Sequence, residues 1–388
     1  MSRLSVDAPA FAPGGGQAPP PVVRKIQIMT PLLGGGFEAG VADSLFTPVR
    51  GSAIRGSLRW FWRATRGTAF STVAELKAAE DRIWGSTTGK SKISVEVLSA
   101  QISPGVDAVR DVNGRKEFEQ PAYALFSAQS DTVRKIHKSG NFDFQVTFPE
   151  EMRAEVETAV TAWLWLGGVG ARTRRGLGAL FCPALVPATA LKIPGIVAAA
   201  KGDIKWPQLS GATYILGPRM NTATEAWVKA IELYKSYRQN RRPGQTPNRP
   251  GRSYWPEPDA IRRLRQKSSP EHSTPVSTDD VFARAEAGLP LIFHFKGYGE
   301  PEDNTLELGE EDSDRMASPL IIKPLIVGER EAYPLILALR TPPLPETLVL
   351  KQSGATDLRV TQGGVPMIEY FLQTAERDWN TKRRVVTA

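Results

Sequence analysis

Alternating and helical spacings of apolar residues divide the first half of the chain into recognisable elements. Alternation predicts strands at residues 24–29, 93–98, 142–148 and 177–185. Helical spacing predicts a helix that starts near residue 51, a second over 72–83 and a third over 150–166. The order is β-α-β-β-α-β with one additional helix. This order predicts a ferredoxin-like module, the arrangement that RNA-recognition sheets also use.

The pattern begins again after residues 186–211, which are rich in Pro, Ala and Gly and indicate a domain boundary. Thr222 and Glu225 have the spacing of a capping box, which predicts a helix through Tyr237. Further patterns predict a short helix at 259–266 and strands at 289–295, 320–326 and 333–339. Residues 300–314 contain eight acidic residues and no basic residue, which predicts an exposed hairpin loop.

We therefore expect an α+β protein made of two ferredoxin-like (RRM-like) modules with insertions. The Pro- and Gly-rich residues 1–22 predict a flexible tail, because they contain few large apolar side chains. The predicted first domain covers 23–190 and the second covers 210–345. Residues 346–388 are expected to form a C-terminal extension.

Charge adds a functional indication to this outline. The 388 residues contain 49 Lys and Arg against 41 Asp and Glu, a net charge of +8 that favours a polyanionic partner. No run of 18 apolar residues occurs, and the N-terminal stretch lacks the apolar core of a signal peptide, so no membrane partner is expected. The single cysteine, Cys182, cannot form an internal disulfide. These features predict a cytoplasmic protein.

The helix that follows Arg50 has one apolar face and one basic face. Its predicted core residues are Ile54, Leu58, Phe61 and Thr65. Its basic residues recur at spacings of four, four and three, and they are Arg55, Arg59, Arg63 and Arg66. Like charges at these spacings repel one another, and arginine can clamp phosphates with two parallel hydrogen bonds. We interpret these arginines and Arg50 as RNA contacts; a solvated charged face is the alternative.

Residues 167–178 combine five glycines with three arginines between a helix and a strand. Gly168 and Gly170 would let the backbone approach a phosphate, and Arg172, Arg174 and Arg175 would supply charge. The spacing is not a dinucleotide fingerprint. We interpret this glycine loop as a cradle for a polyanion, and a flexible connection is the alternative.

Two other segments have weaker signals. Residues 85–91 resemble a P-loop, but only three residues separate their glycines and a helix precedes them, so we interpret them as a tight turn with an exposed Lys90. Residues 234–267 contain ten basic and two acidic residues. Here Arg241, Arg252 and Trp255 are candidate contacts for single-stranded RNA, although Trp255 could equally be a core anchor.

Residues for catalysis or metal binding are not evident in the sequence. The three histidines, His137, His272 and His294, lack metal-ligand spacing, and no nucleophile motif or carboxylate pair can be assigned. We expect no metal, no cofactor and no enzymatic activity.

The residues quoted above resemble the RAMP superfamily of CRISPR proteins, and within it the first RAMP subunits of type III-B (Cmr) effector complexes. The resemblance is carried by residues 30–32, 46–64, 80–85, 167–178, 252–257, 288–295 and 315–320. It covers the chain from about residue 24 to residue 345. Trp84, where the family usually has phenylalanine, and the N-terminal tail depart from the family pattern.

This resemblance implies two RAMP folds and a subunit that holds the 3′ part of the CRISPR RNA and the adjacent end of a target RNA. Other RAMP subunits would be its partners. It implies no catalytic residue, since target cleavage in such complexes is attributed to the repeated backbone subunit. The family also includes guide-processing endoribonucleases, which often use a histidine or tyrosine near the glycine loop. That activity is the alternative function.

Overall fold

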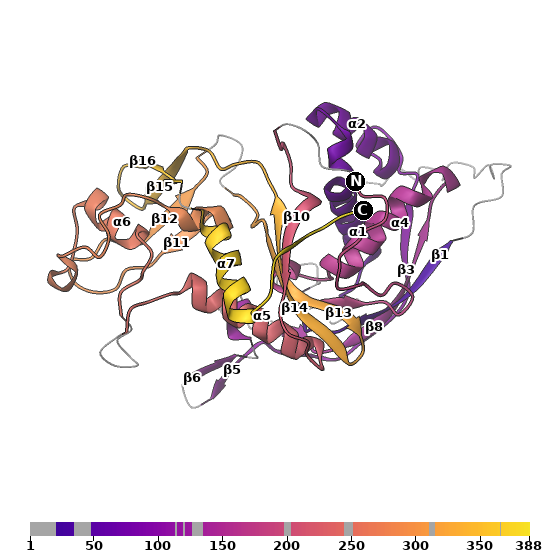
Figure 1. The fold of residues 1–388 in the computed structure, drawn as a ribbon, viewed down its shortest axis with the longest axis horizontal. Helices are drawn as coiled ribbons and strands as arrows, with labels where there is room; N and C mark the ends of the chain where they lie inside the picture. The colour runs from indigo at the N-terminus through magenta and orange to yellow at the C-terminus, as the bar shows by residue number, and fades with distance from the viewer. Residues whose placement is uncertain are drawn as a thin grey trace, which may run out of the picture.

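The structure is a computed structural model that describes residues 21–34, 48–112, 115–118, 121–125, 135–197, 203–243, 251–309, 315–364 and 366–388. Most of the expected tail therefore lies outside the described residues. Figure 1 shows a first sheet at one side, helices beside it, a second sheet in the centre and a smaller lobe at the other side. Among the described residues, no helix is long and apolar enough to cross a membrane.

The first sheet has the strand order of a ferredoxin-like module. Its order is β3-β8-β1-β9, with bounds β1 Val22–Ile28, β3 Ser94–Ile102, β8 Gly140–Thr147 and β9 Leu180–Phe181. Both central pairings are antiparallel. The helices α1 (Gly51–Arg66) and α4 (Arg153–Leu166) follow the first and third of these strands in the chain. The predicted β-α-β-β-α-β order is confirmed.

The second sheet repeats this topology. Its order is β13-β14-β10-β17, with bounds β10 Gln208–Leu216, β13 Leu320–Gly328, β14 Glu331–Arg340 and β17 Arg384–Val385. Its helices are α5 (Ala223–Arg238) and α7 (Met367–Trp379). The Thr222–Glu225 capping box begins α5, as predicted. The α+β fold class with two ferredoxin-like modules is confirmed.

The two modules share one hydrophobic core. Leu58 of α1 and Trp163 of α4 are fully buried in the same cluster as Tyr214, Ile321 and Leu335 of the second sheet. The other face of the second sheet packs on α5 and α7, where Trp227 and Phe371 are buried. The layers are therefore first sheet, α1 and α4, second sheet, and α5 and α7 (Figure 1). A sheet covered on both faces has apolar residues at successive positions, as in residues 320–322 and 325–326 of β13.

A third sheet forms the smaller lobe. Its order is β11-β12-β15-β16, with bounds β11 Leu291–Phe293, β12 Asn304–Glu307, β15 Thr347–Gln352 and β16 Leu358–Thr361. Ile261 of helix α6 (Glu257–Arg265) packs with Leu306 and Leu348 in its core. The remaining elements are α2 Val73–Trp84, α3 Ala122–Leu125, β2 Leu32–Leu33, β4 Gly105–Asp107, β5 Val109–Val112, β6 Arg115–Phe118 and β7 Lys135–His137.

Several sequence-based expectations differ from this arrangement. Strand β10 begins inside the segment expected to be a linker. Within residues 300–314, Asn304–Glu307 form β12 and the side chain of Glu300 is 2% exposed, so the exposed-loop prediction is wrong there. A boundary at residue 345 would separate α7 and β17 from the sheet that they cover and extend. We therefore propose that the second module continues to Val385.

Candidate nucleic-acid interface

The basic face of α1 is largely matched by acids on neighbouring helices. Arg59 bonds to Glu80 and Asp81 of α2, and Arg63 lies 2.7 Å from the same Glu80 oxygen. The Glu80 side chain is only 3% exposed. Arg66 lies 3.8 Å from Glu155 of α4. The sequence indicates only repulsion among these arginines and does not reveal the acids that α2 and α4 present to them from other parts of the chain.

The two remaining basic residues near the start of α1 differ from this pattern. Arg55 donates to the carbonyl oxygen of Trp84, which caps the last turn of α2. Arg50 occupies the N-cap position of α1 and is exposed. The predicted apolar face is confirmed, because Ile54, Leu58 and Phe61 are buried together with Thr65.

The glycine loop is tightly packed against the rest of the protein. The amide of Val169 donates to the carbonyl of Gly178, whose own amide donates to the carbonyl of Pro31. The amide of Ala171 donates to the carbonyl of Leu33. A Cβ at Gly168 would lie 2.6 Å from the carbonyl oxygen of Gly178. The glycines therefore permit close backbone packing, and those three amides already have protein partners. An anion would therefore be attracted by the arginine charges of the loop and not by free backbone amides.

Arg174 and Arg175 connect this loop to the second module. Arg174 donates to the carbonyl of Ser318 at 2.5 Å and lies over the ring of Trp60 at 4.9 Å. Arg175 donates to the carbonyl of Leu320 at 2.8 Å and to the Ser318 hydroxyl at 2.9 Å. Burial, followed by repulsion from Arg175, lowers the pKa of Arg174 to about 10. The loop is therefore not a flexible connection.

Arg238, from the basic residues 234–267, lies close to Arg175 of the glycine loop in the structure. The guanidinium groups of Arg175 and Arg238 lie 5.0 and 5.9 Å from the ring centre of Tyr234. Burial raises the pKa of the Tyr234 hydroxyl, but the two arginines outweigh this effect and lower it. Arg172 is exposed at the surface.

Charge balance distinguishes this group from the face of α1. We call Arg172, Arg174, Arg175 and Arg238 the loop cluster. Within the described ranges, none of its members forms an ion pair with a carboxylate, whereas Arg59, Arg63 and Arg66 each do. Glu257 attracts Arg238 electrostatically, but its carboxylate pairs with Arg284 at 3.2 Å. The loop cluster therefore has uncompensated positive charge that an anion can neutralise.

A small cavity of about 190 Å³ joins α1 to the glycine loop, with Ser57, Trp60 and Arg174 among its lining residues. Below the loop, the side chain of Lys323 is fully buried and its ammonium donates to the carbonyl of Gly167 at 2.6 Å. Burial lowers the pKa of Lys323 to about 7. The sequence predicts the strand that carries Lys323 but does not identify this lysine or its polar contact.

The other candidate RNA contacts in residues 234–267 mostly contact neighbouring parts of the protein. Arg252 pairs with Asp259 at 2.5 Å, and Trp255 packs edge-on against Tyr237 at 5.4 Å. Trp255 is therefore a core anchor, which was one of the two interpretations. Arg241 is exposed beside Ser253, with which it forms an isolated bridge.

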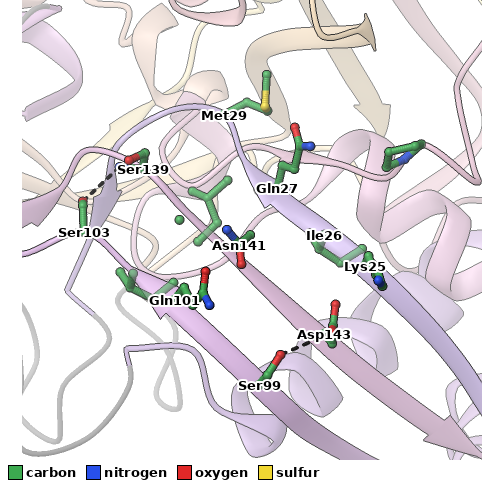
Figure 2. A pocket seen from close by; sticks show the side chains of 14 residues that line it. Lys25, Ile26, Gln27, Met29, Ser99, Gln101, Ser103, Ser139, Asn141 and Asp143 are labelled. Carbon is green, nitrogen blue, oxygen red and sulfur yellow. Dashed lines mark hydrogen bonds between the residues drawn. The ribbon is translucent and has the colours of Figure 1, made fainter.

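The open face of the first sheet carries polar residues that sequence reasoning missed. Gln101, Asn141 and Gln27 stand in one cross-strand row on β3, β8 and β1. Figure 2 shows these carboxamides with Lys25 and Asp143 along a concave surface of about 840 Å³. The polar positions of the alternating strands could have identified this face. It is polar without excess charge, unlike the loop cluster.

The histidines lie apart from these sites. In the part of the chain that the structure describes, no group of three potential ligands could hold a metal ion. His272 contacts Glu300, and His294 lies 2.7 Å from Asp303, both in the smaller lobe. The Nδ1–H of His137 donates a hydrogen bond to the Ser103 carbonyl oxygen at 2.7 Å.

Comparison with known proteins finds a family model that matches the first module, and several similar proteins. Residues 25–180 match the model of the RAMP superfamily. CRISPR system Cmr subunit Cmr1-1 of Pyrococcus furiosus is 31% identical over 144 residues, which are 35% of this chain and 40% of that protein. Subunit Cmr1-2 of the same organism is 27% identical over 179 residues, which are 40% of this chain and 91% of that protein. The match thus spans less than half of the first relative.

Two solved structures are also similar. The crystal structure of apo Cmr1 from Pyrococcus furiosus aligns with a TM-score of 0.47 and 16% identity over 93% of this chain and 97% of that chain. A chain of type III-B Cmr-beta bound to cognate target RNA aligns with a TM-score of 0.45 and 11% identity, covering 92% and 98% of the two chains.

Proposed function

We propose, starting from the match of residues 25–180 to the RAMP superfamily model, that the protein is a non-catalytic RNA-binding subunit of a type III-B CRISPR ribonucleoprotein. Its RNA would be the 3′ part of a CRISPR RNA and the adjacent end of a target RNA. Its protein partners would be other RAMP subunits, and its role would be antiviral defence in the cytoplasm.

The loop cluster is the observation that carries this proposal. Four arginines, none with a carboxylate partner among the described residues, lie around the aromatic ring of Tyr234 and along the adjacent glycine loop. Arginine binds phosphate through a planar fork, and single-stranded RNA provides a phosphate at every nucleotide. Arg172 is the member best placed to reach it, because it is exposed. The partners of Arg59 and Arg63 make the face of α1 a weaker candidate than the loop.

A guide-processing nuclease is the alternative, and it would need an accessible acid or base near the loop. Tyr234 lies there, but it is 2% exposed. Burial raises the pKa of Tyr123, whose ring packs against Tyr234 at 5.9 Å, so its hydroxyl stays protonated at neutral pH and cannot act as a base. Neither tyrosine favours catalysis. Specific cleavage of repeat RNA by the purified protein, abolished by a point mutation, would establish the nuclease instead.

A matched pair of substitutions tests the RNA site. Arg172→Gln removes the exposed charge of the loop cluster, and Arg359→Gln removes an exposed charge from β16 in the smaller lobe. Binding of a short single-stranded RNA is measured by fluorescence anisotropy across a range of salt concentrations. We expect the slope of log K against log salt to fall by about 0.7 for Arg172→Gln and to stay unchanged for Arg359→Gln. Equal slopes for the two variants would show that Arg172 of the loop cluster does not contact the RNA.

A further inference from the structure

The turn at residues 85–91 lies beside basic residues of α1 and α2. Arg55, Arg59, Lys77 and Lys90 line an open concavity of about 680 Å³ together with the turn. The turn itself is internally fixed, since the Ser86 hydroxyl accepts from the amides of Thr88 and Gly89 at 3.2 and 3.1 Å. A rigid polar wall therefore faces four cationic side chains.

Two of the four charges are not balanced by acids. Arg59 bonds to Glu80 and Asp81, and Lys77 lies 2.5 Å from Asp81. Arg55 bonds to a backbone carbonyl and, among the described residues, to no carboxylate. Lys90 is exposed and has no ion pair within the described ranges. The concavity thus retains two positive charges.

The donors around the concavity are of the kind that binds phosphate. Arg55 uses one nitrogen on the Trp84 carbonyl, which leaves other N–H groups of its guanidinium for a ligand. Thr87 is exposed in the turn and adds a hydroxyl. Guanidinium, ammonium and hydroxyl groups around one open concavity match the oxygens of a phosphodiester.

We propose that this concavity, formed by residues 85–91 with Arg55 and Lys90, is a second phosphate subsite for single-stranded RNA. The inference rests on the proposed function and extends it. Trp60, five residues after Arg55 on the same helix, contacts the loop cluster, so α1 connects the two sites. The subsite contributes charge and no catalytic group.

Two neighbouring lysines give a matched test in the full-length protein. Lys90→Ala removes a residue that lines the concavity, whereas Lys92→Ala removes an exposed charge that does not line it. With a short polyuridine RNA, we expect the slope of log K against log salt to fall by about 0.7 for Lys90→Ala only. Equal slopes for the two variants would overturn the subsite while leaving the proposed function intact.

A third variant places negative charge in the concavity without crowding it. A Cβ at Gly89 would meet the Ser86 hydroxyl oxygen at 3.5 Å, which is an ordinary contact distance. Gly89→Asp should therefore keep the melting temperature and weaken RNA binding more than Lys90→Ala does. Unchanged RNA binding by Gly89→Asp would overturn the proposal.

Competitors identify the ligand. Inorganic phosphate and polyglutamate are tested as competitors of RNA on the wild type and on Lys90→Ala. If either displaces RNA from the wild type only, at concentrations as low as those of RNA itself, the ligand of the concavity is a small phosphate or an acidic protein and not RNA. Failure of the wild type to bind RNA at any salt concentration would refute the proposed function as well, which separates the two failures.

Discussion

At the scale of single residues, Glu80 decides what the basic face of α1 does. Its carboxylate is 3% exposed and receives bonds from both Arg59 and Arg63. A buried charge that loses its partners is strongly destabilising. The arginine face is therefore at least partly a structural ion-pair network that links α2 to α1.

Replacing both arginines should consequently destabilise the protein. Arg59→Ala with Arg63→Ala leaves Glu80 buried without its two partners, and we expect the free energy of unfolding in urea to fall by about 3 kcal/mol. Adding Glu80→Gln to this double variant removes the stranded charge and should restore part of the loss. If the double variant is as stable as the wild type, the network is not structural.

Glu300 predicts a dependence of stability on pH. Burial raises its pKa, but bonds from Ser269, His272 and Arg262 outweigh burial and lower it to about 2. Because the folded pKa lies below the unfolded value of 4.5, the contribution is complete above pH 4.5 and is lost as the pH falls towards 2. Glu300→Gln should cost about 3 kcal/mol at pH 7 in urea denaturation and much less near pH 2. A cost independent of pH would contradict this.

At the scale of elements, the glycine loop owes its shape to residues outside it. Gly176 has a φ of +81°, and a Cβ there would lie 2.4 Å from the ring of Trp227 on α5. At Gly56 of α1, in contrast, an added Cβ would meet no described atom within 4 Å. The surroundings and backbone of Gly176 therefore require glycine, whereas those of Gly56 do not.

The two glycines should respond oppositely to alanine. Gly176→Ala should lower the free energy of unfolding by about 1 to 3 kcal/mol, since it combines a left-handed backbone with a clash. Gly56→Ala should raise it by about 0.5 to 1 kcal/mol, because alanine favours the helix. Thermal denaturation measures both. A stable Gly176→Ala variant would mean that the loop moves freely.

Elements with a strong local signal could be predicted from the sequence. The amphipathic spacing of α1 and the capping box of α5 identify their helices without tertiary information. Strand β10 escaped prediction because both its faces are buried, so its residues do not alternate, and Ser210 and Gly211 resemble a loop. Strand β17 has only two residues and is defined by pairing with Tyr214, which is 170 positions before Arg384.

The candidate site divides in the same way. The glycine loop is visible as a composition, and its position between a helix and a strand is confirmed. The meeting of Arg175 and Arg238 at Tyr234 joins segments that are distant in sequence, so only the fold reveals it. The acids Glu80 and Asp81 lie on a helix that the sequence predicts, but their direction towards α1 depends on packing.

At the scale of the whole molecule, the shared core joins the two modules into one cooperative unit. Helices α1 and α4 lie between the two sheets, so separating the modules would expose buried apolar side chains of both. Unfolding should therefore show a single transition by two probes: tryptophan fluorescence, which reports on Trp163 and Trp227, and far-ultraviolet circular dichroism. Two separate transitions would show that the modules unfold independently.

Lys323 lies fully buried beneath the glycine loop, and burial lowers its pKa to about 7, so this amine exchanges its proton near neutral pH. A phosphate that settles on the loop would favour the charged form and draw a proton from the buffer. The heat of RNA binding should then change with the ionisation enthalpy of the buffer, as titration calorimetry in PIPES and in Tris would reveal, and Lys323→Met should abolish the difference. Equal heats in both buffers for the wild type would contradict it. Through this one buried amine, the amount of RNA bound would depend on the acidity of the cell.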